Sequence, residues 1–199
     1  MKSNICKIDS GTRDLAAILR ESEKVAVYNE LNHKQTMQLR LICEEIDGML
    51  PNIIDDFEGA FWIEFEDGVC KVKVSLRFEE FTAVKKADLV GIAKNKKNAA
   101  ARGIVGKIRS AIENVFLDED VISDYEIASG SYYYTTEYNE YMDYSCLWTL
   151  DRYKSIVGKE DQSEEWDELE KSLIASLADD VIVGVKGKQA DIIIVKKFA

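Results

Sequence analysis

The chain has 199 residues, of which 46% are hydrophobic and 32% charged, and its formal net charge at pH 7 is −11. This length and apolar fraction suit a globular protein with a substantial core, and no apolar stretch is long enough to cross a bilayer. The negative charge disfavours broad adhesion to nucleic acid or to an anionic membrane, because both attract positive surface.

The N-terminal part predicts a short strand at residues 5–8 and a helix at about residues 12–31. A second helix follows, with Asn32 placed as its N-cap. Pro51 lies near the end of this helix and is expected to kink or end it, because proline has no backbone N–H to donate. Apolar residues recur along the second helix at three- and four-residue steps, which places them on one face toward a core: Leu39, Ile42, Cys43, Ile46, Met49, Leu50 and Ile53.

Residues 60–78 predict a β-hairpin in which two alternating runs flank Asp67-Gly68, a pair that accepts the positive φ angles of a tight turn. We expect one face of the hairpin to be covered and the other to be wet. The apolar face carries Phe61, Ile63, Phe65, Cys70, Val72, Val74, Leu76 and Phe78, and the other carries Trp62, Glu64, Lys71, Lys73, Ser75 and Arg77.

The C-terminal residues 166–198 repeat the order of helix and hairpin, with Ser163 as the expected N-cap and a turn at Gly187-Lys188. Residues 192–195 are apolar on both sides, so they predict a central strand with both faces covered. The elements together predict an α+β fold, a two-layer sandwich with helices packed on one face of a mostly antiparallel sheet. The helical spacing runs through Trp166, Leu169, Leu173, Ile174 and Leu177.

A single proline and the lack of a low-complexity linker indicate one domain, residues 1–199, with a large insertion at about residues 82–150. The four cysteines are scattered without CxxC spacing, so we expect reduced thiols. The N-terminus lacks the apolar run of a signal peptide, and the expected location is therefore cytoplasmic.

Two segments carry a resemblance to a known family. Residues 39–45 read Leu-Arg-Leu-Ile-Cys-Glu-Glu, and residues 173–181 read Leu-Ile-Ala-Ser-Leu-Ala-Asp-Asp-Val. With the order of elements around them, these segments resemble the histidine-kinase-like ATPase superfamily, nearest its branch of bacterial anti-sigma-factor serine kinases. The resemblance implies a site for ATP and Mg²⁺, in which Glu45 is the catalytic base, Glu44 contacts the cofactor and Asn52 is the metal ligand.

The chain departs from the family at each nucleotide element. The family has an asparagine one turn after its glutamate, whereas Gly48 and Met49 stand at that distance from Glu44 and Glu45. Residues 76–81 lack the Asp-Gly pair that reads adenine, and residues 163–168 are bulky and acidic where the family has a glycine-rich phosphate turn. We therefore expect no cofactor and favour a regulatory protein-interaction module. An ATP-dependent serine/threonine kinase with an aberrant pocket is the alternative.

A second possible anion site lies at Gly103 and Gly106, which lead into an apolar helical pattern beside Lys107. Backbone amides at such a position can bind phosphate. The favoured interpretation is that the glycines permit close helix packing, because short glycine patterns have weak specificity. His33 is the only histidine, which excludes a multi-histidine metal site and favours an exposed residue near the helix cap.

The predicted insertion holds two unusual compositions. Basic residues gather in residues 85–109, and tyrosines with small polar neighbours crowd residues 125–144. Tyrosine is well suited to recognition surfaces, although packing of a strand against the sheet explains it slightly better. We expect a protein partner, with a homodimer possible and nucleic acid the weakest option. The residues that we assign to partner binding are Lys94, Lys96, Lys97, Tyr133, Tyr138 and Tyr141.

Overall fold

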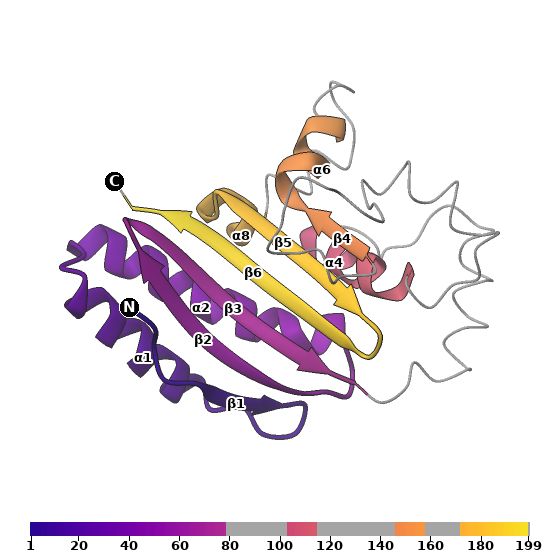
Figure 1. Cartoon of the computed structure of the whole chain (residues 1–199), viewed down its shortest axis with the longest axis horizontal. Helices are drawn as coiled ribbons and strands as arrows, with labels where there is room; N and C mark the ends of the chain where they lie inside the picture. Colours follow the sequence, from indigo (N-terminus) through magenta and orange to yellow (C-terminus); the bar gives the residue numbers. More distant parts are fainter. Residues whose placement is uncertain (79–102, 115–145, 158–171, 199) are drawn as a thin grey trace.

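The computed structural model describes residues 1–78, 103–114, 146–157 and 172–198. Figure 1 shows the helices and strands in these parts. In chain order they are β1 (Cys6–Asp9), α1 (Leu15–Tyr28), α2 (His33–Ile53), β2 (Glu58–Glu66), β3 (Val69–Arg77), α4 (Gly103–Asn114), β4 (Cys146–Thr149), α6 (Leu150–Val157), α8 (Leu173–Leu177), β5 (Asp180–Lys186) and β6 (Gln189–Lys197).

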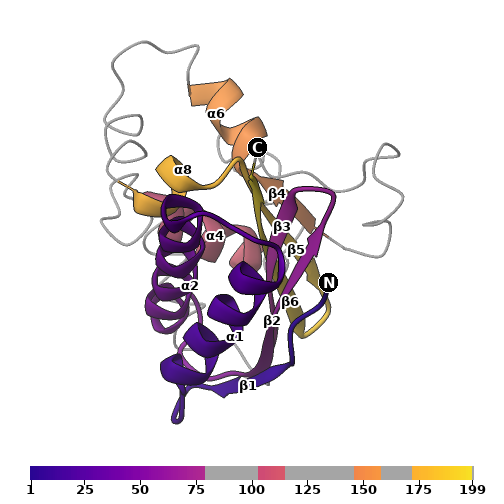
Figure 2. The same cartoon turned by 90° about the vertical axis from the view of Figure 1, so that its left-hand side faces the viewer.

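The strands form one six-stranded sheet in the order β1-β2-β3-β6-β5-β4, and each neighbouring pair is antiparallel. The two hairpins lie side by side because β3 pairs with β6 along their whole lengths. Figure 2 shows α1, α2 and α4 on one side of the sheet. The predicted α+β class is therefore confirmed.

One main core lies between the helices and the sheet. The inward residues of both hairpins and the apolar face of α2 belong to it, and Leu39, Ile42 and Ile46 are fully buried. A second, smaller cluster on the other face of the sheet contains Leu147, Ile182 and Ile193. Strand β6 therefore contributes buried side chains to both faces, as the sequence of residues 192–195 predicts.

The N-terminal hairpin confirms the alternation read from the sequence. Residues 61, 63 and 65 of β2 are buried, as are residues 70, 72, 74 and 76 of β3. The turn residues Asp67 and Gly68 have φ angles of 49° and 77°. Both angles are positive, as a primed hairpin turn requires.

The chain before β1 extends the edge of the sheet and contains a bulge. Lys2 lies opposite Glu64 and Cys6 lies opposite Phe61. The Ser3 N–H donates to the carbonyl of Ile63 at 2.8 Å, so Asn4 and Ile5 together occupy the space opposite one residue of β2. Two residues opposite one define a β-bulge, a feature that interrupts an edge ladder.

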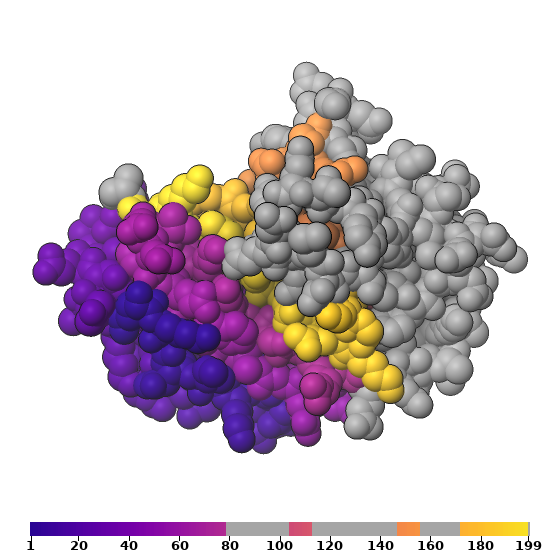
Figure 3. All heavy atoms as spheres, in the orientation of Figure 1, coloured from indigo at the N-terminus to yellow at the C-terminus, as the bar shows by residue number. Residues whose placement is uncertain are grey.

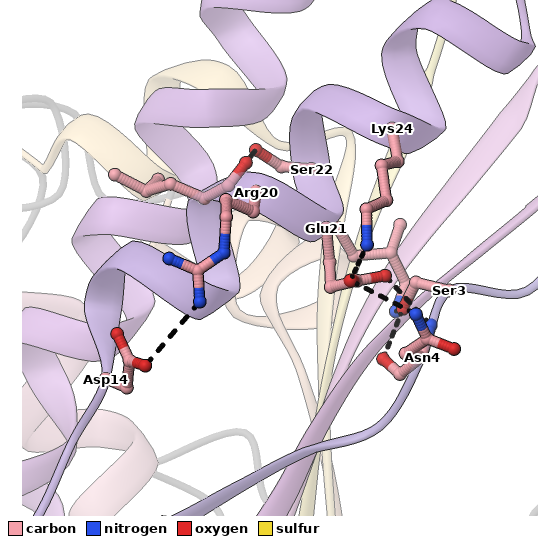
Figure 4. A network of polar contacts seen from close by, with 9 residues as sticks. Ser3, Asn4, Asp14, Arg20, Glu21, Ser22 and Lys24 are labelled. Carbon is pink, nitrogen blue, oxygen red and sulfur yellow. Dashed lines mark hydrogen bonds and ion pairs between the residues drawn. The ribbon is translucent and has the colours of Figure 1, made fainter.

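A buried carboxylate fastens this edge segment to α1, as Figure 4 shows. Glu21 accepts hydrogen bonds from the backbone and side-chain amides of Asn4 at 3.0 and 3.2 Å, and one from Lys24 Nζ at 2.6 Å. Burial raises the pKa of Glu21, but the hydrogen bonds from Lys24 and Asn4 outweigh burial and lower it overall. Glu21 therefore remains ionised and holds the bulge against the helix.

Helix α2 begins after the predicted cap and continues beyond Pro51. Asn32 and Gln35 form a reciprocal capping box at its start. Pro51 does not end the helix, which continues to Ile53. An end at Pro51, one of the two effects expected of this residue, therefore does not occur, and an arginine contact described below supplies the physical reason.

The C-terminal helix is shorter than its apolar spacing predicts. Ser172 has extended φ and ψ angles of −76° and 121°, and its hydroxyl caps α8 by accepting from the N–H of Ala175 at 3.3 Å. The prediction of one continuous helix from residue 166 to residue 177 was therefore wrong at Ser172, because a serine side chain offers the backbone an N-cap in place of helix continuation. The predicted cap Ser163 and Trp166 lie outside the described residues.

Two parts of the predicted insertion belong to the main structure. Strand β4 pairs with β5 at the sheet edge, and Trp148 on β4 is fully buried. Ile108 and Ile112 of α4 join the same core as α2. Among the described residues, no helix combines the length and the apolar character needed to span a membrane.

Candidate functional site

The two glutamates proposed for cofactor and catalytic roles lie near the middle of α2. Both Glu44 and Glu45 are half-buried, at the border of the apolar face. Glu44 accepts a charge-assisted hydrogen bond from Arg40 Nε at 3.0 Å, and Arg40 also contacts Glu23 of α1 at 3.1 Å. Glu44 is thus one member of a surface ion-pair chain that joins α1 to α2.

Asn52, the proposed metal ligand, lies apart from the two glutamates. It is exposed near the end of α2, and its Nδ2 is 3.5 Å from the carbonyl oxygen of Gly48. It lies seven positions after Glu45, which corresponds to a rise of about 10 Å along an α-helix. Within the described ranges, no group of three or more His, Cys, Asp or Glu side chains is arranged to hold a metal.

The proposed anion-binding segment is helical from Gly103 onward. Gly106 is buried inside α4, where α4 packs against α2 and the strands β4 and β5. Lys107 Nζ lies 5.0 Å from the centroid of the Tyr153 ring of α6, a cation–π distance. Arg109 Nη1 is 3.5 Å from the backbone oxygen of Asn52. Lys107 and α4 therefore take part in the packing of the fold. Anion binding by Gly103, Gly106 and Lys107 stays a prediction.

A buried acid that the sequence reading missed lies on the same helix. Asp47 is buried with 9% of its side chain exposed, and its Oδ2 is 3.6 Å from Nη1 of Arg13. Its other carboxylate oxygen, Oδ1, is buried without a hydrogen-bond partner. The signal was present in the sequence, because Asp47 is one turn from Cys43 and from Leu50, two members of the buried face.

Arg13 makes a second contact that explains how α2 passes its proline. Its Nη1 donates to the backbone oxygen of Asp47 at 2.6 Å. In an α-helix this oxygen accepts from the N–H four residues later, which here belongs to Pro51 and does not exist. The guanidinium takes the place of the missing donor. Arg13, immediately before the N-cap Asp14 of α1, therefore fastens the start of α1 to the last turns of α2.

Burial raises the pKa of the Asp47 carboxyl above its ordinary value of 3.8, and the attraction of Arg13 opposes this rise without cancelling it. A buried carboxylate with an unpartnered oxygen is costly, since its desolvation is incompletely offset. Asp47 is thus a buried acid whose desolvation is only partly offset, whereas Glu44 has Arg40 and solvent beside it.

The sheet face opposite the helices has an ordered charge cluster of its own. Glu64 accepts hydrogen bonds from Lys73 Nζ and Trp62 Nε1, both at 2.8 Å, and lies 3.5 Å from Lys2 Nζ. Lys2 Nζ is also 5.1 Å from the centroid of the Trp62 ring. Burial raises the pKa of Glu64, but the hydrogen bonds from Lys73 and Trp62 and the nearby lysine charges lower it to about 2.

The residues that we assign to partner binding, Lys94, Lys96, Lys97, Tyr133, Tyr138 and Tyr141, lie outside the described parts of the chain. Their assignment stays a prediction.

Comparisons with protein-family models, with curated proteins and with solved structures found no match.

Proposed function

We propose that the chain is a bacterial regulatory protein-interaction module, built on a histidine-kinase-like ATPase scaffold whose nucleotide site is largely lost. The order of elements supports the scaffold: a long helix leads into one hairpin, a short helix leads into a second, and the two hairpins pair through β3 and β6. The family resemblance of residues 39–45 and 173–181 falls on α2 and on α8 with the start of β5.

The observation that carries the proposal is the dispersal of the proposed nucleotide residues along α2. Glu44 is engaged by Arg40, and Asn52 is exposed near the end of the helix. A magnesium nucleotide needs several oxygen ligands within one coordination shell. Because Glu44 is engaged by Arg40 and Asn52 lies about two helical turns from both glutamates, we favour a role in binding macromolecules over phosphoryl transfer.

The thiols of the described residues support the cytoplasmic location included in this proposal. Cys6, Cys43 and Cys70 are free thiols. Burial raises the pKa of Cys43 well above its ordinary value and that of Cys70 to about 12. Both groups therefore remain protonated and inert, as structural cysteines in a reducing compartment are.

Calorimetric titration with ATP and ADP, each with and without Mg²⁺, tests the proposal, together with thermal unfolding under the same conditions. A ligand that binds the native state raises its stability, so the proposal expects no shift in Tm at millimolar nucleotide. A saturable heat and a rise in Tm would overturn it in favour of the serine/threonine kinase. In that case Glu45→Gln should abolish transfer while Arg40→Gln, a change on the same helix, should leave residual activity.

The partner-binding side of the proposal needs substitutions rather than a deletion of residues 82–150, because α4 and β4 contribute to the main core. Replacing Tyr133, Tyr138 and Tyr141 together by Ala is expected to weaken the binding of a partner captured by the wild-type chain. The Tm of the chain should stay unchanged. A large fall in Tm with binding intact would instead assign these tyrosines to packing.

A further inference from the structure

On the sheet face that points away from the helices, lysines of β1, of the segment before it and of β3 flank strand β2. Lys73 lies opposite Trp62 in the register, and Lys71 lies opposite Glu64. Because side chains alternate along a strand, these residues share one face. We call Lys2, Lys7, Lys71 and Lys73, together with Trp62 at their centre, the open-face cluster. Figure 3 shows this side of the molecule, with the N-terminal segment and β2 and β3 in indigo and magenta.

Positive charge predominates in this cluster although the chain is acidic overall. Three of its lysines, Lys2, Lys71 and Lys73, adjoin one carboxylate, Glu64, and Lys7 lies opposite Ala60, while the whole chain has a net charge of −11. At the two ends of β2, Glu58 is in register with Arg77 on one side and with Asp9 on the other, and Glu66 shares a row with Lys197. The excess of positive charge therefore lies at the middle of this face. The depressed pKa of Glu64 reflects the same surroundings.

The middle of the cluster is rigidly held. Lys73 keeps only 14% of its side chain exposed and contacts Glu64, which in turn accepts from the indole N–H of Trp62. This arrangement fixes the Trp62 ring on the sheet. Lys2 is more exposed, at 54% of its side chain, and Lys7 is also exposed. A fixed aromatic ring with exposed cations at its margin is a common composition of recognition surfaces.

We propose that the open-face cluster binds an acidic, extended segment of a protein partner, whose carboxylates contact the lysines while an apolar side chain packs on Trp62. The inference rests on the proposed function and specifies the chemistry of its partner. Charge complementarity argues for it, since a positive strip on an acidic body attracts an acidic segment and orients it toward that strip. Nucleic acid is the other polyanion that such a strip could attract, and the test below separates the two occupants.

The test is fluorescence anisotropy with the full chain and a labelled peptide that has a central leucine between two runs of four glutamates. The informative variant is Lys2→Glu with Lys7→Glu, because both side chains are exposed. Its matched control is Lys34→Glu with Lys188→Glu, which changes the net charge equally at exposed positions on α2 and in the β5–β6 turn. We expect the first pair to weaken binding about tenfold, or about 1.4 kcal/mol, relative to the control. Trp62→Ala should weaken it as well.

Equal weakening by both pairs would overturn the inference, since it would show attraction by net charge alone. Absence of saturable binding at peptide concentrations up to about 1 mM would overturn it too, as would tighter binding of a thymidine oligonucleotide of equal charge. Each of these results leaves the proposed function intact as long as no nucleotide binds. Saturable ATP binding would defeat the proposed function whatever the peptide does, so the two failures are distinguishable.

Discussion

At the scale of single residues, the guanidinium of Arg13 makes two stabilising contacts. It donates to the carbonyl oxygen that Pro51 leaves without a partner, and it lies beside the buried carboxylate of Asp47. An unsatisfied buried acceptor and an unpaired buried charge are each costly. The stability of the joint between α1 and α2 should therefore depend on this one side chain.

Arg13→Met is expected to lower the free energy of unfolding by about 2–3 kcal/mol. The loss should shrink when Pro51→Ala is added, because that substitution restores the backbone N–H that the carbonyl oxygen of Asp47 needs. Chemical denaturation of the two single variants and the double variant gives the coupling energy. Arg20→Met is the control, since Arg20 makes an exposed contact with Asp14 at 3.7 Å. Strict additivity would contradict the replacement of the missing donor.

The raised pKa of Asp47 should be detectable in the pH dependence of the unfolding free energy. Its pKa is raised in the folded state above the ordinary 3.8, so the folded state binds this proton more tightly than the unfolded state does. Its contribution is therefore favourable at low pH and is lost as pH rises above 3.8 through the raised value. Relative to Asp47→Asn, the wild-type chain should lose stability across this range. Glu64, with a lowered pKa of about 2, works in the opposite direction, and its stabilisation disappears as pH falls from 4.5 to 2. If the difference in unfolding free energy between wild type and Asp47→Asn were the same at all pH values, the prediction would be contradicted.

At the scale of elements, the close approach of β2 and β3 depends on Gly59. A Cβ atom there would collide with the backbone oxygen of Ser75 and come within 3.0 Å of Leu76 Cδ2. Since backbone cannot yield as a flexible side chain does, the two strands would have to separate locally.

Gly59→Ala is expected to destabilise the fold by about 2–3 kcal/mol. The same substitution at Gly48, where a Cβ meets no atom within 4 Å on the exposed side of α2, should stabilise it by about 0.5–1 kcal/mol. Thermal or urea unfolding of the two variants compares them directly. Equal effects of the two changes would show that strand contact is not the cause at Gly59.

The sequence predicted those elements whose pattern is local and missed those features that depend on distant groups. The alternation of β2 and β3, the Asn32 cap and the two-sided burial of β6 all follow from neighbours along the chain, and each is confirmed. The path of α2 through Pro51 could not be predicted, because the donor that permits it comes from before α1. Ser172 was missed for a related reason, as helical spacing alone does not show where a serine caps instead of continuing.

The candidate site shows the same division. Glu44 and Glu45 were identified by resemblance, and the structure gives them positions but tests no role. Asp47 escaped notice because acidic residues are most often exposed, whereas its spacing placed it with the buried face. The open-face cluster required the register of three strands, and the sequence of one hairpin could indicate only that this face is wet.

At the scale of the whole molecule, the core does not separate the predicted insertion from the rest. Ile108 of α4 and Trp148 of β4 are fully buried in the cluster that also contains Leu39 and Val72. The sheet accepts β4 as its last strand. These parts of the chain should therefore unfold together with the hairpins.

Ile108→Ala is expected to lower the stability of the whole chain by about 2–4 kcal/mol and to keep a single unfolding transition. Val27→Ala serves as the control, since 79% of Val27 is exposed and its change should have little effect. Circular dichroism and tryptophan fluorescence followed together provide the measurement. Two separate transitions, or an unchanged midpoint for Ile108→Ala, would indicate that α4 folds on its own.

Because Arg13 replaces the backbone donor that Pro51 lacks, substitutions at positions 13 and 51 should be linked in evolution. A lineage that exchanges Pro51 for another residue regains the N–H and relaxes the demand on position 13, whereas loss of the arginine first would be selected against. Among natural relatives of this chain, the two positions should therefore change in a preferred order, with arginine lost only after proline.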